Sequence, residues 1–291
     1  MRSLTLKSFA KLNLFLKVLN KRPDNYHNIE TLFERISLYD TITLRLRSDG
    51  IINITCDNPD LPTDEANFCY KSAKVLQDKY KVKEGVDIRI VKRIPVSAGL
   101  GGGSSNAATT LIGLNRLWRL NLSLNRLVSL SKQIGCDVPF FIYDSSFAFG
   151  LNRGDKIVPL NALKDLRLWH ILIVPKITVS TPFVYNKWDA FSGLTTSTHD
   201  VKIITSALRI KAVSLLPALL YNGLEDVTLR FYPEVRRVKK KLVHLGLKSI
   251  LMSGSGPAVF GLVSSRKEAV RVTNEARKPD RSWRIFVIST V

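Results

Sequence analysis

The glycine-rich segment Pro95–Ala108 (PVSAGLGGGSSNAA) constrains the chain more than any other stretch. Four of the five residues from 99 to 103 are glycines, which adopt positive φ and let a backbone approach a ligand closely. Ser104 and Ser105 follow, at the start of a helix predicted over about 104–118. Free N–H groups and the dipole at a helix N-terminus attract anions, and serine hydroxyls add donors or a metal contact. The segment predicts a phosphate-binding loop.

Two widespread phosphate motifs do not describe this loop. No lysine follows the glycines as in GK[ST], and position 104 is Ser where a dinucleotide fingerprint counted from Gly99 needs Gly. A flexible turn with an N-capping serine is the simpler alternative, but such a turn does not require four glycines. A second glycine-rich loop, Ser253–Pro257, lies between two predicted strands, where a hairpin turn explains it equally well.

Size and composition indicate a folded protein of the cytoplasm. The chain has 291 residues, 45% hydrophobic and 23% charged, enough for two modest domains or one large one. Cys56, Cys69 and Cys136 form no CxxC pair, so we expect reduced thiols. Lysines interrupt the apolar N-terminal stretch and no apolar run reaches about 18 residues, so neither a signal peptide nor a membrane span is expected.

The net charge of +20 makes RNA binding a serious alternative, because a basic surface attracts polyanions. The densest run of cations, Arg236–Lys241, falls in a helix predicted over 233–245. That helix has an apolar stripe of Val235, Val238, Leu242 and Leu245. The cations then occupy its outer face, and interleaved aromatic residues are absent. We favour a solvated helix face and expect no specific nucleic-acid partner.

Strand and helix patterns mix along the chain without regular βαβ spacing, which favours an α+β fold. Residues 8–16 alternate, with Lys11 and Asn13 on the same face of a strand. Residues 40–56 are predicted to form a hairpin that turns at 48–50, and 86–94 a strand that ends at Pro95. A domain boundary is expected near residues 152–155, which divides the chain into 1–153 and 154–291.

A phosphoryl transfer also needs a cation and a group that takes the proton of the acceptor. Lys11 and Asn13 are candidates, although a lysine on a strand is more often surface. Asp137 precedes an apolar run, where it acts either in catalysis or as a turn residue. Tyr26 and His27 lie in a predicted turn and either stack on a base or cover the core.

These pieces together resemble the GHMP kinases over nearly the whole chain. The phosphate loop of that family is matched by Gly99-Leu-Gly-Gly-Gly-Ser-Ser-Asn-Ala-Ala108, and its last motif by Ser253-Gly-Ser-Gly-Pro-Ala-Val-Phe260. Three more motifs point to a branch whose substrate is an alcohol that carries cytidine diphosphate: residues 10–16, 26–33 and 135–141.

The resemblance implies two α+β lobes, an N-terminal lobe like a ribosomal-protein domain and a ferredoxin-like C-terminal lobe, with the active site in the cleft between them. It implies ATP with Mg²⁺, and a small-molecule alcohol as acceptor. Asp137 matches the general base and Lys11 the lysine beside it. The ATP phosphates would be bound by Pro95, Val96, Ser97, Ala98, Gly99, Leu100, Gly101, Gly102, Gly103, Ser104 and Ser105.

Other positions are carried over from the family in the same way. Asn67 and Lys92 resemble its adenine-pocket residues, and Asn13, Tyr26 and His27 those that hold the cytidine end. Tyr185 would offer a second stacking ring; no residues are assigned to Mg²⁺. Asn25 stands where relatives have Gly, and it tolerates the left-handed conformation better than most residues. A different GHMP kinase and a basic RNA-binding protein on a related fold remain the alternatives.

Overall fold

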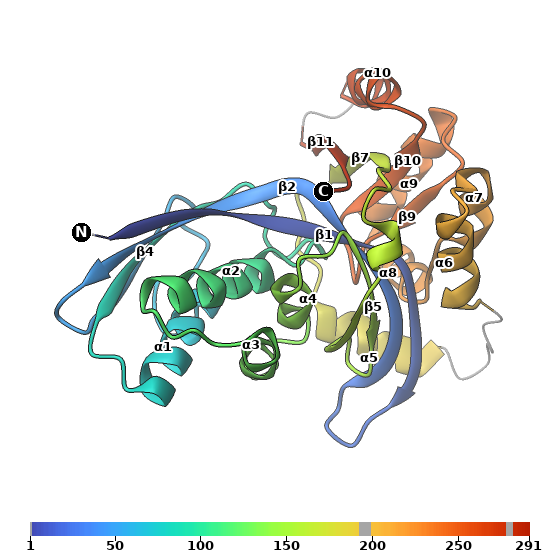
Figure 1. Ribbon diagram of the computed structural model, residues 1–291. Helices are drawn as coiled ribbons and strands as arrows, with labels where there is room; N and C mark the ends of the chain where they lie inside the picture. The colour runs from blue at the N-terminus through green and yellow to red at the C-terminus, as the bar shows by residue number, and fades with distance from the viewer. Residues whose placement is uncertain (1, 192–198, 278–281) are drawn as a thin grey trace.

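The computed structural model describes residues 2–191, 199–277 and 282–291. These residues form two β-sheets, each with helices packed against it (Figure 1). The larger sheet has seven strands and includes the N-terminus: β1 (Ser3–Lys21), β2 (His27–Arg47), β3 (Ile52–Cys56), β4 (Gly85–Val91), β5 (Phe147–Leu151), β6 (Lys156–Pro159) and β8 (Tyr221–Asn222). The smaller sheet has four strands in the order β11-β7-β10-β9: β7 (Trp169–Val174), β9 (Ile250–Met252), β10 (Val259–Val263) and β11 (Arg284–Ser289).

A long antiparallel pair, β1 and β2, runs the length of the molecule in Figure 1. The turn between these strands includes Asn25, which has φ of +63°, so the asparagine does adopt the left-handed conformation expected of it. The alternation predicted for residues 8–16 is confirmed, but both faces of this strand are buried. The second face is covered because the C-terminal half of the chain packs on it: Ala10 and Leu12 share a hydrophobic cluster with Leu251 and Phe260.

The hairpin predicted over residues 40–56 is wrong. β4 takes the place beside β2, with Thr41–Arg47 paired antiparallel to Val91–Gly85, and β3 pairs with β4 in parallel. β4 is the better neighbour for a central strand because Val86, Ile88 and Ile90 are fully buried. The alternating exposed residues of β3 suit the sheet edge that it occupies.

Four helices cover one face of the larger sheet: α1 (Phe68–Tyr80), α2 (Gly102–Leu117), α3 (Leu124–Ser131) and α4 (Val138–Ile142). α2 lies at the centre of this group and contacts β1, β2 and the other three helices. Its buried face is rich in small residues, among them Ala107, Ala108 and Gly113, so the helix approaches the sheet closely. A Cβ at Gly113 would lie 2.4 Å from the side chain of Leu44 on β2.

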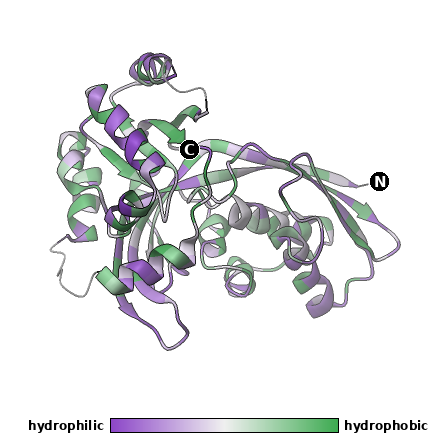
Figure 2. Ribbon diagram, turned by 180° about the vertical axis from the view of Figure 1, so that it is seen from behind, coloured by the Kyte–Doolittle hydropathy of each residue, from purple (hydrophilic) through white to green (hydrophobic). Residues whose placement is uncertain are grey.

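The remaining helices belong to the second half of the chain: α5 (Thr181–Phe191), α6 (Val201–Arg209), α7 (Leu216–Leu219), α8 (Glu225–Phe231), α9 (Pro233–His244) and α10 (Arg266–Ala276). Short 3₁₀ turns occupy Asn161–Leu163 and Val213–Leu215. Figure 2 shows hydrophilic and hydrophobic residues alternating along the helices, as expected where one face packs on a sheet. On α9 the predicted face is confirmed: Val235, Val238 and Leu242 are buried, and Arg236 and Arg237 are exposed.

The domain boundary expected between residues 153 and 154 falls inside a hairpin. Residues 152–155 connect β5 to β6, and both strands belong to the larger sheet. The chain leaves that sheet only after Pro159 and returns to it with the two-residue strand β8. Within the described residues, every helix is too short or too polar to cross a bilayer.

Candidate active site

Two adjoining cavities, of about 830 Å³ and 510 Å³, lie where the two halves of the chain meet. Phe68, Gly99, Gly101, Ser104 and Thr181 line both, so the glycine-rich loop forms part of the boundary between them. The smaller cavity is lined by the residues expected to bind the nucleotide: Asn67, Lys92 and 95–104. The larger one is lined by those expected to bind or act on the acceptor: Lys11, Asn13, Tyr26, His27, Asp137 and Tyr185.

Helix α2 begins at the wall of the smaller cavity. Its N-cap is Gly101, which has φ of +68° and offers no side chain to cap the helix. The N–H groups of the first helical residues have no acceptor within the helix. Gly102, Gly103 and Ser104 carry these groups and line the cavity, so the positive end of the helix dipole adjoins it.

The two glycine-rich loops predicted from the sequence pack against each other. The hydroxyl of Ser253 donates to the carbonyl of Gly99 (3.0 Å) and accepts from the backbone N–H of Asn13 on β1 (3.2 Å). The backbones are so close that a Cβ on Gly99, where φ is +74°, would lie 2.1 Å from the carbonyl oxygen of Ser253. The second loop is therefore more than a hairpin turn, because it positions the first.

The side chain of Lys11 reaches the carboxylate of Asp137 from β1. Its Nζ lies 3.6 Å from Asp137 Oδ2 and donates to Asn13 Oδ1 at 2.5 Å. Asn13 is fixed in turn, because its Nδ2 donates to the hydroxyl of Thr31 at 2.7 Å. The pairing of β1 with β2 shifts register on both sides of this stretch, between Phe9 and Ala10 and between Asn13 and Phe15. Such irregularities re-aim side chains at the sites where they occur.

Burial and charge act on this pair in opposite directions. Burial lowers the pKa of the Lys11 ammonium, and the neighbouring Asp137 carboxylate opposes that change. Asp137 is the N-cap residue of α4, but its side chain makes no capping bond to the helix. It is 31% exposed, whereas Lys11 is 4% exposed. The carboxylate therefore faces the cavity, with a buried cation behind it.

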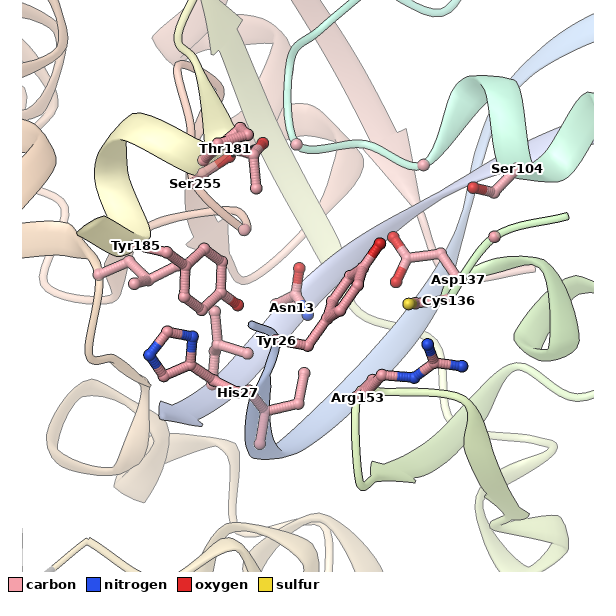
Figure 3. Close-up of a pocket in the computed structure, with 18 of the residues that line it drawn as sticks. Asn13, Tyr26, His27, Ser104, Cys136, Asp137, Arg153, Thr181, Tyr185 and Ser255 are labelled. Atoms are coloured by element: carbon pink, nitrogen blue, oxygen red, sulfur yellow. Dashed lines mark hydrogen bonds between the residues drawn. The ribbon is translucent and has the colours of Figure 1, made fainter. Parts of the chain in front are cut away.

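Aromatic rings line the end of the larger cavity where the β1–β2 turn meets α5. Tyr26 is half-exposed, with the guanidinium of Arg153 5.2 Å from the centre of its ring. His27 is buried: its ring stacks on Tyr185 at 5.1 Å, and its Nε2 lies 2.6 Å from Asp189 Oδ1. In the view of Figure 3, Asn13 appears between Tyr26 and Tyr185. One face of the His27 ring is thus already covered, so Tyr26 is the more open of the two rings predicted to stack on a base.

Three of the residues expected to bind the nucleotide have side chains committed elsewhere. Ser105 lines neither cavity, because its hydroxyl is buried against that of Ser8 at 2.7 Å. The amide of Asn67 caps α1 through Cys69 and donates to the carbonyl of Pro62. The ammonium of Lys92 pairs with Asp40. Asn67 and Lys92 therefore line the cavity while their polar groups bind protein.

Sequence reasoning missed several residues that line the larger cavity. The hydroxyls of Thr181 and Ser255 lie 2.7 Å apart, which joins the start of α5 to the second glycine-rich loop. Ser255 belongs to a loop that the sequence singled out, and Arg153 to the segment read as a domain boundary. Cys136 lies beside Asp137, but burial raises the pKa of its thiol to about 11, so it is protonated at neutral pH.

A resident metal centre built from protein ligands is absent from the part of the chain that the structure describes. No three His, Cys, Asp or Glu side chains there come together in a group suited to a metal ion. Mg²⁺ does not require such a group, because it is often held by one or two protein oxygens together with substrate phosphates. Ser104 and Asp137 both supply oxygens to the larger cavity and fit that second arrangement.

Family comparisons agree with this architecture. The profile of the GHMP kinases N terminal domain matches residues 67–145, and that of the GHMP kinases C terminal domain matches residues 204–281. A crystal structure of homoserine kinase from Cytophaga hutchinsonii shares the fold, with a TM-score of 0.73 at 18% identity over 100% of this chain and 95% of that one. The chain belongs to the GHMP kinase family, and its two-lobed α+β fold is confirmed.

Within that family its similarity to one group extends over almost the full length. The chain is 44% identical over 273 residues to the 4-diphosphocytidyl-2-C-methyl-D-erythritol kinase of Shouchella clausii (strain KSM-K16), covering 94% of this chain and 90% of the relative. A crystal structure of 4-(cytidine 5'-diphospho)-2C-methyl-D-erythritol kinase matches with a TM-score of 0.81 at 30% identity, over 98% of both chains. The chain is therefore a small-molecule kinase of this group.

Proposed function

We propose that the protein transfers the γ-phosphoryl group of ATP to the 2-hydroxyl of 4-diphosphocytidyl-2-C-methyl-D-erythritol, in the non-mevalonate route to isoprenoid precursors. The observation that carries the proposal is the position of Asp137. Its carboxylate lines the acceptor cavity with the Lys11 ammonium 3.6 Å away. Gly101 and Ser104, at the start of α2, line the same cavity. A hydroxyl held beside Asp137 would then lie near a phosphate held at α2.

The nucleotide would occupy the smaller cavity with its phosphates at the N-terminus of α2. Free N–H groups there would bind phosphate oxygens, and the glycines let those oxygens approach the backbone closely. Gly103 illustrates the available space, because a Cβ built on it meets nothing closer than Phe68 at 3.8 Å. Asn67 and Lys92 would form part of the wall of this cavity, and their polar groups would stay bonded to protein.

The acceptor would occupy the larger cavity with its cytidine end against Tyr26, His27 and Tyr185. Tyr26 is half-exposed, and stacking of a base on such a ring contributes about 1–3 kcal/mol. His27 would present the edge of its ring, because Asp189 holds one of its nitrogens and Tyr185 covers one face. Asn13 would lie between this end and the reacting hydroxyl.

In the reaction, the carboxylate of Asp137 would accept the proton of the acceptor hydroxyl as its oxygen forms a bond to the γ-phosphorus. The bond between that phosphorus and the bridging oxygen of ADP breaks, and its electron pair leaves with ADP. The Lys11 ammonium, 3.6 Å from the Asp137 carboxylate, would stabilise negative charge on the transferred group. Mg²⁺, when bound, would neutralise phosphate charge, with the Ser104 hydroxyl as a protein ligand that fits.

The proposal is tested by ADP release from the purified protein with ATP, Mg²⁺ and the cytidine-diphospho-methylerythritol. We expect substrate-dependent release, and a loss of about 10²–10⁴ in kcat for Asp137→Asn, since that is what a general base contributes. Asp144→Asn is the matched control, because this carboxylate is fully exposed and pairs with Arg35 outside both cavities. Release by the wild type with no loss in Asp137→Asn would move the base elsewhere; no release by folded wild type would refute the substrate.

A further inference from the structure

A buried carboxylate that neither cavity contains connects the two ends of the glycine-rich loop. Asp40 lies on β2, and its side chain is completely buried. Its Oδ1 accepts from the backbone N–H groups of Arg93 and Ile94, at 2.7 and 2.8 Å. Its Oδ2 accepts from Nδ2 of Asn106 on α2 at 2.9 Å. The residues just before and just after the loop 95–105 are thus bonded to the same carboxylate.

The same carboxylate holds Lys92, which lies at the base of the loop and lines the nucleotide cavity. Lys92 Nζ donates to Asp40 Oδ2 and also to Asn106 Oδ1 at 3.3 Å. The ammonium is 4% exposed and lies close to the first turn of α2, since a Cβ on Gly102 would be 2.8 Å from Nζ. Without the Asp40 carboxylate, the buried Lys92 ammonium would have no counter-charge. The free-energy cost of that unpaired charge would favour displacement of the lysine side chain toward solvent.

The network continues from Asn106 into the strand that carries Lys11. Asn106 Nδ2 also donates to the hydroxyl of Ser8 on β1 at 2.9 Å, and Ser8 bonds the hydroxyl of Ser105. The polar atoms of this group find their partners within it, so they hold a single arrangement of β1, β2 and the start of α2. Loop closure is easier when both ends of a loop are already fixed.

We propose that Asp40 is a positioning residue for the nucleotide: it fixes both ends of the phosphate loop and holds Lys92 beside the first turn of α2. The inference rests on the proposed use of ATP in the smaller cavity. It predicts a much larger effect on the nucleotide than on the acceptor, because Asp40, Lys92 and Asn106 are absent from the lining of the acceptor cavity. A residue that merely stabilised the fold would affect both substrates alike.

Asp40→Asn is the direct test, because it keeps the shape of the side chain and removes the charge. We expect the Kd of a non-hydrolysable ATP analogue, titrated without the second substrate, to rise by about tenfold or more, since small displacements of binding groups have effects of this size. The KM for ATP should rise in parallel while the KM for the cytidine substrate stays within about twofold. Hydrogen exchange of the amides in 97–105 should become faster.

Glu34→Gln is the matched control, since Glu34 is also on β2, also fully buried and also paired with a protein side chain, His170. It should lower thermal stability without changing the Kd of the analogue. Equal increases of that Kd in both variants would overturn the proposal, as would an unchanged Kd in Asp40→Asn. If Asp40→Asn does not fold, Asn106→Ala removes the bond to α2 but keeps the ion pair, and an unchanged Kd there overturns the proposal too. Failure of the proposed function would give a different result: the wild-type protein would bind the ATP analogue but would release no ADP with the cytidine substrate.

Discussion

At the scale of single residues, the site depends on an ammonium that burial disfavours. Lys11 is held between the side-chain amide oxygen of Asn13, the Asp137 carboxylate and the face of the Phe33 ring, whose centre is 5.4 Å from Nζ. Two of these partners carry full or partial negative charge, and the third attracts a cation through its π-electrons. They compensate for lost hydration, yet the pKa of Lys11 is still below its ordinary value of 10.5. Lys11 therefore loses its proton at a lower pH than an exposed lysine does.

The lowered pKa of Lys11 predicts a loss of activity at alkaline pH. If the ammonium must be protonated, kcat/KM falls as pH rises through its pKa, which lies below 10.5. The contribution of Lys11 to the free energy of unfolding changes in the opposite direction. Between its folded and unfolded pKa values the unfolded chain binds more protons than the folded one, so stability rises with pH. A pH–rate profile, recorded alongside circular dichroism, therefore separates the two effects.

Lys11→Arg provides the control for that profile. A guanidinium stays protonated throughout the range, so the alkaline limb should disappear, although the wider group should lower kcat at neutral pH. The interpretation fails if Lys11→Arg keeps the same alkaline limb as the wild type, because another group would then be titrating.

Part of the site was predictable from the sequence at this scale, and part was not. Lys11 and Asn13 were predicted to share a face of one strand, and the structure places them in contact because side chains two residues apart point the same way. The partner of Lys92 could not be predicted, since Asp40 is 52 residues away along the chain. The inward direction of Ser105 was missed for the same reason, because Ser8 faces it from β1.

At the scale of elements, the close contact of the two glycine-rich loops limits what the first loop tolerates. Gly99→Ala would place a methyl group 2.1 Å from the carbonyl oxygen of Ser253 and would force a positive φ on alanine. Backbone strain and overpacking each cost about 1–3 kcal/mol. We expect urea unfolding to show a loss of about 2–4 kcal/mol, together with a higher KM for ATP.

Gly246→Ala separates the two causes. Gly246 follows α9 with φ of +85°, but a Cβ built on it meets nothing within 4 Å. Its replacement should show the strain alone, about 1 kcal/mol, with no change in the KM for ATP. A loss as large as that of Gly99→Ala would mean that contact with Ser253 contributes nothing.

Element types were easier to predict than element partners. The helix after the loop and the strands on either side of Ser253–Pro257 follow local patterns and are confirmed, as α2, β9 and β10. The position of β3 depends on whether β2 pairs with residues 52–56 or 85–91, a choice between distant segments that no local pattern encodes. Local patterns did not predict β2, residues 27–47, as one strand, although they did predict the turn at Tyr26 and His27 where it begins.

At the scale of the whole molecule, a buried contact between a carboxyl side chain and an imidazole joins the two sheets. Glu34 on β2 lies 2.9 Å from Nε2 of His170 on β7, and both side chains are fully buried. Thr290 donates to the same carboxylate at 2.6 Å, so the C-terminal residues take part. Removing one member of a buried pair leaves the other uncompensated, whereas removing both does not.

His170→Phe should therefore lower the free energy of unfolding by about 3–5 kcal/mol. The double variant Glu34→Leu/His170→Phe should recover most of that loss, because neither buried polar side chain is left without its partner. Urea unfolding followed by circular dichroism measures both. A double variant less stable than His170→Phe alone would contradict this expectation. It would show that the interaction between the two side chains outweighs the cost of burying them.

The hydroxyl of Ser253 joins segments that lie far apart in the order of synthesis. Because a ribosome adds residues in sequence order, Lys11 and the glycine-rich loop are synthesised long before Ser253, the residue that joins Gly99 to β1. The first half of the chain therefore emerges before this contact can form, and synthesis of the β9–β10 hairpin supplies it. A chain that ends before residue 253 would lack this link between the glycine-rich loop and β1.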